Sequence, residues 1–298
     1  MSRPEGWSLA KREAFYGILF AMPAILGFLI FSFGPMLASL GISFTNWSLL
    51  SAPGWVGTEN YQRLATDPLI GQSLGNTTRY ALLAVPIGLI ASLLIAVLLN
   101  QKVKGQRLFL LMFYLPSILP AVSVIVVWLW LLEPNFGLVN TALHSLGLPT
   151  LRWFSDPSTV IPSFVLMSLW GAGGGAVIFL ASLQGVSQDL YDAAMVDGAG
   201  RLRCFRHITL PMISPVIFFN LVTGTIGALQ TFTQGYLIGG GRDNSALFYN
   251  LYLYQSAFRQ GEMGYAAAMA WLLFILIMIL TALVFRSSGL WVFYESRK

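Results

Sequence analysis

The sequence is poor in charged residues, cysteine and histidine. Charged residues occupy 10% of its 298 positions, whereas soluble globular domains carry roughly 25%, so the chain lacks the polar coat that a water-exposed surface needs. The single cysteine, Cys204, excludes an intramolecular disulfide. The sequence also has no cluster of Cys, His and carboxylate residues with metal-ligand spacing, so we expect no metal site. Apolar residues fill 56% of the positions, which predicts a protein whose natural solvent is lipid.

Basic residues outnumber acidic ones, which gives a net charge of +5. A basic excess suits either nucleic acid or an anionic membrane surface. The Arg and Lys residues stand between apolar runs and never form a long basic patch. We therefore expect contact with a lipid bilayer and no nucleic-acid partner.

Six apolar runs are long enough to cross a membrane. A helix needs about 20 apolar residues to cross roughly 30 Å of hydrocarbon, and in lipid such a run becomes a helix because its backbone must satisfy its own hydrogen bonds. The first run, from Phe15 to Phe33, is too long for a cleaved signal peptide and is interpreted as a retained span. The predicted spans have no Asp, Glu, Lys or Arg in their interiors and lie at about 14–34, 79–100, 108–132, 160–183, 212–238 and 264–285.

The loops between the spans predict the orientation. Twelve Lys and Arg residues fall on one side of the membrane and five on the other, and positively charged loops stay in the cytoplasm. Both termini are therefore expected in the cytoplasm, which requires an even number of spans. The sequence predicts an all-α integral membrane protein with one transmembrane domain over residues 1–298.

Two classes of membrane protein are disfavoured by what the spans lack. An ion-coupled secondary transporter of a neutral polar solute would show ionisable residues inside the membrane and often an internal repeat, and the sequence shows neither. A membrane-embedded enzyme needs convergent catalytic residues, but His144 and His207 fall on opposite faces of the membrane. We expect no catalytic residue, and we keep the ion-coupled transporter as the alternative function.

The predicted cytoplasmic loop at 187–211 contains a short helix, a glycine break and a second short helix. Ser187 or Asp189 can cap the first helix, and Gly198 can take the left-handed conformation that ends it. Pro211 suits the start of the fifth span. One face of the first helix carries Leu190, Ala193, Ala194 and Asp197 at helical spacing. The segment fits an ordinary capped connector, and it equally fits a helix that docks into a groove of another protein.

The same segment resembles the EAA motif of ABC importer permeases. In that motif, Glu-Ala-Ala is followed by three residues, a glycine and, about nine residues later, Ile-x-Leu-Pro. The matching residues are Asp192, Ala193, Ala194, Gly198, Ile208, Leu210 and Pro211. Asp197, Ala199 and Phe205 are similar to the sugar-importer branch of the family. One departure is the aspartate at 192 in place of glutamate, which keeps the charge but shortens the side chain.

The similarity extends along nearly the whole chain, and the ending from Phe285 to Glu295 resembles the subunit type related to the maltose-importer permease MalF. The resemblance implies a type I ABC importer permease fold, in a bacterial or archaeal inner membrane, in which the 187–211 loop supplies a coupling helix to a separate ATPase. The residues implied in this coupling are Asp192, Ala193, Ala194, Asp197, Gly198, Ala199, Phe205 and Pro211.

The resemblance also implies partners. They are a dimer of ATP-binding cassette ATPase subunits, a second homologous permease of the MalG type and an extracytoplasmic solute-binding protein. The chain contains no Gly-x-x-x-x-Gly-Lys-Ser/Thr phosphate loop. It is therefore expected to hold no cofactor itself, with ATP and Mg bound by the partner ATPase.

The fifth predicted span carries a polar stripe at helical spacing. Polar groups inside a membrane face a bundle interior or a water-filled cavity, so the stripe fits hydrogen bonds between packed helices or a path for an uncharged, hydroxyl-rich solute. In the family that the chain resembles, the equivalent span contributes to the sugar site. The candidate path consists of Asn220, Thr223, Gly227, Gln230, Phe232, Gln234 and Tyr236. The absence of buried Lys and Arg disfavours an anionic substrate.

Overall fold

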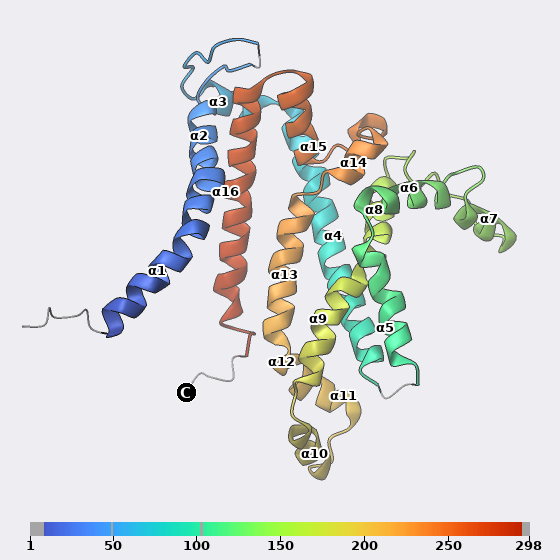
Figure 1. The fold of residues 1–298 in the computed structure, drawn as a ribbon. Helices are drawn as coiled ribbons and strands as arrows, with labels where there is room; N and C mark the ends of the chain where they lie inside the picture. Colours follow the sequence, from blue (N-terminus) through green and yellow to red (C-terminus); the bar gives the residue numbers. More distant parts are fainter. Residues whose placement is uncertain (1–8, 49, 102–103, 294–298) are drawn as a thin grey trace, which may run out of the picture. The chain divides into compact units, whose positions relative to one another are not determined.

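The computed structural model describes residues 9–48, 50–101 and 104–293, and Figure 1 shows its helices. None of these residues forms a strand beyond two isolated β-bridges, Thr45 to Trp55 and Ser48 to Glu262. The prediction of an all-α protein is confirmed. The chain divides into two compact units, one of Met1–Thr66 with Ser256–Leu272 and the other of Asp67–Gln255 with Leu273–Lys298. The single domain over 1–298 stays a prediction.

The first unit begins with a long apolar helix. α1 (Leu9–Phe28) continues through a π-helical turn, Leu29–Phe33, into α2 (Gly34–Ile42). The run Arg12–Ile42 is long and apolar enough to cross a membrane, and its most apolar stretch has no residue buried within the chain. Lipid or a partner must cover this surface, because bare apolar surface in water is unfavourable. The predicted span at 14–34 lies in this helix.

The segment after α2 consists, in its described residues, mainly of turns and irregular backbone followed by one short helix. Within it, α3 (Glu59–Thr66) supplies Asn60, whose Nδ2 donates to the carbonyl oxygens of Ser43 at 2.8 Å and Thr45 at 2.9 Å. α16 (Met263–Ser288) begins in the same unit. An added Cβ at its Gly264 would lie 1.9 Å from the carbonyl oxygen of Thr45. Only glycine therefore permits this close approach.

α4 (Pro68–Leu99) is the central helix of the second unit. It starts at Asp67, whose Oδ1 accepts a hydrogen bond from the backbone N–H of Leu69 at 2.9 Å, and proline occupies the first turn. The helix packs against α8 (Val160–Leu169), α9 (Ala172–Gln184) and α13 (Ser214–Leu229) (Figure 1). It begins eleven residues before the predicted span at 79–100, because the capped start extends beyond the apolar run.

Small residues let α9 approach its neighbours closely. An added Cβ at Gly173 would lie 1.8 Å from the carbonyl oxygen of Phe113 in α5 (Gln106–Tyr114), and one at Gly175 would lie 2.8 Å from Ser92 Oγ in α4. These glycines therefore serve close helix packing. Below them lies an apolar core of Ala96, Leu99, Ala176, Phe179, Leu180, Leu183 and Ile213.

Two of the predicted spans are broken. The region 108–132 consists of α5, a 3-10 turn at Leu115–Ile118 and α6 (Ala121–Leu131), and its two halves meet at 99°. Pro116 and Pro120 lack an N–H and interrupt the helical hydrogen bonds there. The region 160–183 consists of α8 and α9, bent by 47°. The described residues contain four helices long and apolar enough to cross a membrane, or up to six if each bent pair is one span.

The remaining elements gather at two ends of the second unit. One end holds α10 (Gln188–Val196), α11 (Arg201–Cys204) and α12 (Leu210–Met212). The other holds α7 (Leu138–Ser145), α14 (Thr233–Ile238) and α15 (Tyr249–Tyr254) (Figure 1). The predicted cytoplasmic loop at 187–211 thus lies at one end of the second unit, and α7, α14 and α15 lie at the opposite end (Figure 1). Which end is cytoplasmic stays a prediction.

Candidate functional site

The 187–211 segment folds as a short helix that ends at a glycine. Ser187 Oγ accepts a hydrogen bond from the N–H of Asp189 at 3.3 Å and caps α10. Gly198 has a φ of +78°, and its N–H bonds to the carbonyl of Met195 at 3.0 Å. The predicted cap and glycine break are both confirmed. α11 then continues through a π-helical turn, Phe205–Thr209, into α12.

Most of the surface of α10 is exposed, since none of its residues is buried and only Tyr191 and Ala194 are half-buried. Of the predicted coupling residues, Asp192, Ala193, Asp197 and Gly198 are exposed, and Ala194, Ala199, Phe205 and Pro211 are half-buried. A groove of about 970 Å³ runs beside the helix, and Ala199 and Phe205 are part of its lining. A hydrogen bond of 2.9 Å between Tyr191 Oη and Thr209 Oγ1 ties α10 to the π-helical turn. No local sequence pattern pairs these two residues, so this tie is not predictable from the sequence.

A second feature is a cavity of about 380 Å³ between α4, the break between α8 and α9, and α13. Four residues of the predicted path line it: Asn220, Thr223, Gly227 and Gln234. The other polar lining residues are Tyr80, Ser92, Ser168 and Thr231, none of which belongs to the predicted path. Thr231 flanks the predicted stripe, whereas Ser92 and Ser168 are single polar residues between apolar ones, which only a search for lone polar side chains would find.

The other three predicted path residues do not line this cavity, and the prediction of one continuous helix face is wrong. α13 ends at Leu229, and Phe232 has the non-helical angles φ −137° and ψ −57° before α14 begins. The carbonyl oxygen of Gln230 accepts a hydrogen bond from Asn250 Nδ2 at 2.8 Å. Phe232 and Tyr236 instead stack on each other, with ring centroids 5.3 Å apart, next to Tyr254.

The cavity offers uncharged hydrogen-bonding groups. Its described lining residues include no Asp, Glu, Lys, Arg or His. Asn220 Nδ2 donates to the carbonyl of Val216 at 2.9 Å, and Thr223 Oγ1 donates to the carbonyl of Phe219 at 2.9 Å. Both of these bonds stay within α13 and do not bridge to another helix. The side-chain oxygens of Asn220 and Thr223 can therefore accept hydrogen bonds from the hydroxyl groups of a solute.

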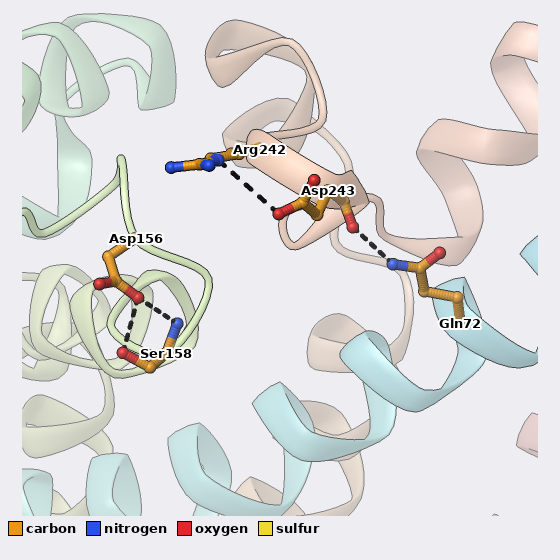
Figure 2. Close-up of polar contacts among 5 residues, drawn as sticks. All are labelled: Gln72, Asp156, Ser158, Arg242 and Asp243. Atoms are coloured by element: carbon orange, nitrogen blue, oxygen red, sulfur yellow. Dashed lines mark hydrogen bonds and ion pairs between the residues drawn. The ribbon is translucent and has the colours of Figure 1, made fainter.

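The loop between α14 and α15 is strained and is held by α4. Asp243 and Asn244 have positive φ values of 54° and 57°, a conformation that costs non-glycine residues energy. Gln72 Nε2 donates to the carbonyl oxygen of Asp243 at 2.6 Å, as Figure 2 shows. The buried amide of Asn76 donates to the carbonyl oxygens of Asn244 at 2.9 Å and Leu247 at 3.2 Å. Side chains of α4 thus fix the path of this loop.

The same loop supports the helix that carries Gln234. Thr77 Oγ1, fully buried in α4, accepts a hydrogen bond from the N–H of Tyr249 at 2.9 Å. An added Cβ at Gly235 in α14 would lie 2.6 Å from the carbonyl oxygen of Ala246. The loop, α14 and α4 therefore pack as one block at the α14 end of the cavity.

A few charged side chains lie near this block. Asp156 Oδ1 accepts hydrogen bonds from Ser158 Oγ at 2.7 Å and from its N–H at 2.8 Å (Figure 2). These bonds, with the nearby charges of Arg152 and Arg242, hold the pKa of Asp156 below its ordinary value. Arg242 Nε lies 3.7 Å from Asp243 Oδ2, and both side chains are exposed.

The sequence matches a known family. Residues 84–289 match the family described as binding-protein-dependent transport system inner membrane component. The matched part includes α10, the glycine break and α13.

Two relatives are similar over almost their whole length. The chain is 40% identical over 294 residues to the "Probable ABC transporter permease protein YesP" of Bacillus subtilis (strain 168). This alignment covers 97% of this chain and 95% of that protein. It is 33% identical over 289 residues to the "Lactose transport system permease protein LacF" of Rhizobium radiobacter, covering 93% and 95%.

The fold has a close counterpart among solved structures. A chain in the crystal structure of a bacterial alginate ABC transporter, in complex with an alginate pentasaccharide-bound periplasmic protein, superposes with a TM-score of 0.82 at 24% identity. The superposition covers 94% of this chain and 96% of that chain. The predicted type I ABC importer permease fold is confirmed.

Proposed function

We propose that this chain, which belongs to the family of binding-protein-dependent transport system inner membrane components, forms half of the pore of an ATP-driven carbohydrate importer. The observation that carries this proposal is the exposed helix α10 with its glycine break. A helix of nine residues with no buried residue gains little stability from packing within its own chain. A partner that covers it would supply the missing stabilisation.

The partner proposed for α10 is an ATP-binding cassette subunit. Exposed apolar side chains beside the carboxylates of Asp192 and Asp197 give a surface that fits a groove on another protein. These apolar side chains are Leu190, Met195, Val196 and Leu202. Two ATPase subunits, which bind ATP and Mg, would drive a pair of permeases, this chain and a second one of the MalG type. Both termini and α10 would then lie in the cytoplasm.

The proposed solute is a sugar or oligosaccharide, delivered by an extracytoplasmic solute-binding protein. The uncharged lining of the central cavity supports a neutral, hydroxyl-rich solute, because amide and hydroxyl groups bind such a solute without a charge to neutralise. The name of LacF, which is similar to this chain, refers to lactose transport. Asn220, Thr223, Gly227 and Gln234 are the residues proposed to contact the solute.

Copurification tests this proposal. The tagged chain, extracted from its native membrane in a mild detergent, is expected to bring down an ATPase subunit and a second permease. The matched control is Gly198→Leu, which should insert into the membrane but lose the ATPase. An ion-coupled transporter would purify without an ATPase, and that result would reject the proposal.

A further inference from the structure

The hydroxyl groups that line the central cavity are already engaged in hydrogen bonds, and this gives the cavity a polarity. Its described lining residues carry five side-chain hydroxyl groups, those of Tyr80, Ser92, Ser168, Thr223 and Thr231. A serine or threonine hydroxyl has one hydrogen to donate and two lone pairs that accept. Where that hydrogen is directed decides whether a solute meets a donor or an acceptor at the group.

Three of these hydroxyl groups direct their hydrogen to the backbone of this chain. Ser92 Oγ donates to the carbonyl oxygen of Ala172 at 2.8 Å, and Ser168 Oγ donates to the carbonyl oxygen of Val165 at 2.7 Å. Thr223 uses its hydrogen in the same way within α13. Each of the three oxygens keeps its lone pairs, so a solute meets each of them as an acceptor.

The other two hydroxyl groups are engaged with side chains of the same lining. The hydroxyl of Tyr80 is hydrogen-bonded to the side chains of Ser168 and Thr231. Because Ser168 directs its hydrogen to the backbone, Tyr80 donates to Ser168, and Thr231 donates to Tyr80. The ring of Tyr80 is held edge-on by the buried rings of Phe164 and Phe248, with centroids 6.5 Å and 5.5 Å away. The described lining therefore leaves no hydroxyl hydrogen for a solute.

Two acceptors of the lining lie close to the same glycine of α9. An added Cβ at Gly175 would lie 2.8 Å from Ser92 Oγ and 3.6 Å from Asn220 Oδ1. Ser92 belongs to α4 and Asn220 to α13, and both line the cavity. The amide nitrogen of Asn220 donates to the carbonyl oxygen of Val216, and its Oδ1 can only accept. Because residue 175 has no side chain, oxygens from two helices come together as a pair of acceptors.

This polarity favours a solute that donates hydrogen bonds. Each hydroxyl group of a sugar has a hydrogen to donate, whereas an ionised carboxylate can only accept. The side-chain donors left in the described lining are the amide groups of Asn220 and Gln234. A buried acceptor without a donor costs free energy. The cavity therefore disfavours sugar acids by its hydrogen-bond pattern as well as by its lack of basic residues.

Building on the proposed transport function, we propose that the cavity selects its solute as a hydrogen-bond donor, with Ser92 as a specificity-determining residue beside Asn220. Ser92 Oγ and Asn220 Oδ1 accept hydrogen bonds from two adjacent hydroxyl groups of a neutral sugar. A solute that lacks the hydrogen at one of these positions leaves an oxygen of the pair without a partner. Sites built to hydrogen-bond a hydroxyl group reject analogues that lack it.

Competition for uptake tests this polarity. Proteoliposomes with the complete transporter are given labelled lactose, maltose and cellobiose, and analogues of the accumulated disaccharide compete, each with one hydroxyl group replaced by hydrogen or by fluorine. Fluorine has no hydrogen to donate. At two adjacent positions, we expect both replacements to raise the inhibition constant about tenfold, because each leaves a buried acceptor unpaired.

Two serine variants assign the effect to Ser92. In Ser92→Ala, one acceptor is gone, so the penalty at one of the two positions should disappear. The matched control is Ser73→Ala. Ser73 is also a buried serine of α4 that donates to its own backbone, at 3.2 Å to Ile70, but it does not line the cavity. The control should keep both penalties, and the elution volume of the assembled transporter shows that both variants fold.

Fluorinated analogues that compete as well as the parent sugar would overturn the inference, because a lining of acceptors gains nothing from fluorine. Equal penalties in Ser92→Ala and Ser73→Ala would overturn the role of Ser92. ATP-driven uptake of labelled glucuronate in place of the neutral sugars would overturn selection by donors but leave the transport function standing. A wild-type transporter that accumulates no sugar of this set would reject the transport function itself.

Discussion

Replacing Gly198 by leucine tests whether the bend after α10 transmits force. The residue has a φ of +78°, in the left-handed region. An added Cβ there meets no atom within 4 Å. The added Cβ therefore meets no atom of the chain, and the expected effect of the substitution is on the conformation of the backbone.

The size of the effect follows from that conformation. A left-handed backbone costs a residue with a side chain roughly 1–2 kcal/mol relative to glycine. This range corresponds to a factor of about 5–30 in the population of the bent form. Without the bend, the hydrogen bond from the N–H of Ala199 to the carbonyl of Ala194, now 2.8 Å long, would also be lost.

Uptake into proteoliposomes that contain the complete transporter is the suitable assay. We expect Gly198→Leu to lower ATP-driven uptake at least about fivefold, with unchanged insertion and reduced binding of the ATPase. The matched control is Gly200→Leu, because Gly200 has a φ of −76° that any residue adopts, and it also has open space around it. Wild-type uptake by Gly198→Leu, with the ATPase still bound, would refute the role of the bend.

Three further predictions concern the second unit. Gly173→Val would push a side chain into the carbonyl of Phe113, which lies 1.8 Å from the added Cβ, and should destabilise the protein by about 1–3 kcal/mol or more. The melting temperature in detergent measures this loss. The control Gly88→Ala, where the added Cβ has open space, should leave the melting temperature nearly unchanged. Asn76→Leu would remove two hydrogen bonds to the 242–249 loop, a loss of about 1–3 kcal/mol. The variant should raise the KM for uptake while assembly with the ATPase persists. An unchanged KM would show that the loop does not support the cavity. The hydrogen bonds from Ser158 hold the pKa of Asp156 below its ordinary value, so the stabilisation that Asp156 gives to the loop around it is present above about pH 4 and is lost as the pH falls through the lowered pKa. The protection factor of the Ser158 amide against hydrogen exchange should therefore fall in acid in the wild type but not in Asp156→Asn.

Local signals made the 187–211 segment predictable. A serine cap, a glycine that must be left-handed and a proline at the next helix start each act within a few residues. The structure places the cap at Ser187 and the left-handed residue at Gly198, as predicted. The apolar runs were equally direct signals for the membrane helices, because length and hydropathy suffice.

The parts that were not predicted depend on contacts between distant residues or on breaks inside apolar runs. Hydropathy does not report the 99° bend between α5 and α6, since both halves are apolar; the sequence signal for this break is the pair of prolines, Pro116 and Pro120. The helical spacing of the polar residues predicted one continuous helix face beyond Leu229, but the helix ends at Leu229. The hydrogen bond from Tyr249 to Thr77 joins residues 172 positions apart, and no sequence period reports such a pairing.

The most direct test measures solute accumulation in sealed proteoliposomes that hold this chain, its partner permease, the ATPase and the binding protein. We predict that a labelled sugar accumulates only when ATP is hydrolysed, and that collapse of the proton and sodium gradients leaves accumulation unchanged. Accumulation that persists with a hydrolysis-dead ATPase, or that stops when the ion gradients collapse, would contradict a permease driven through the bend at Gly198.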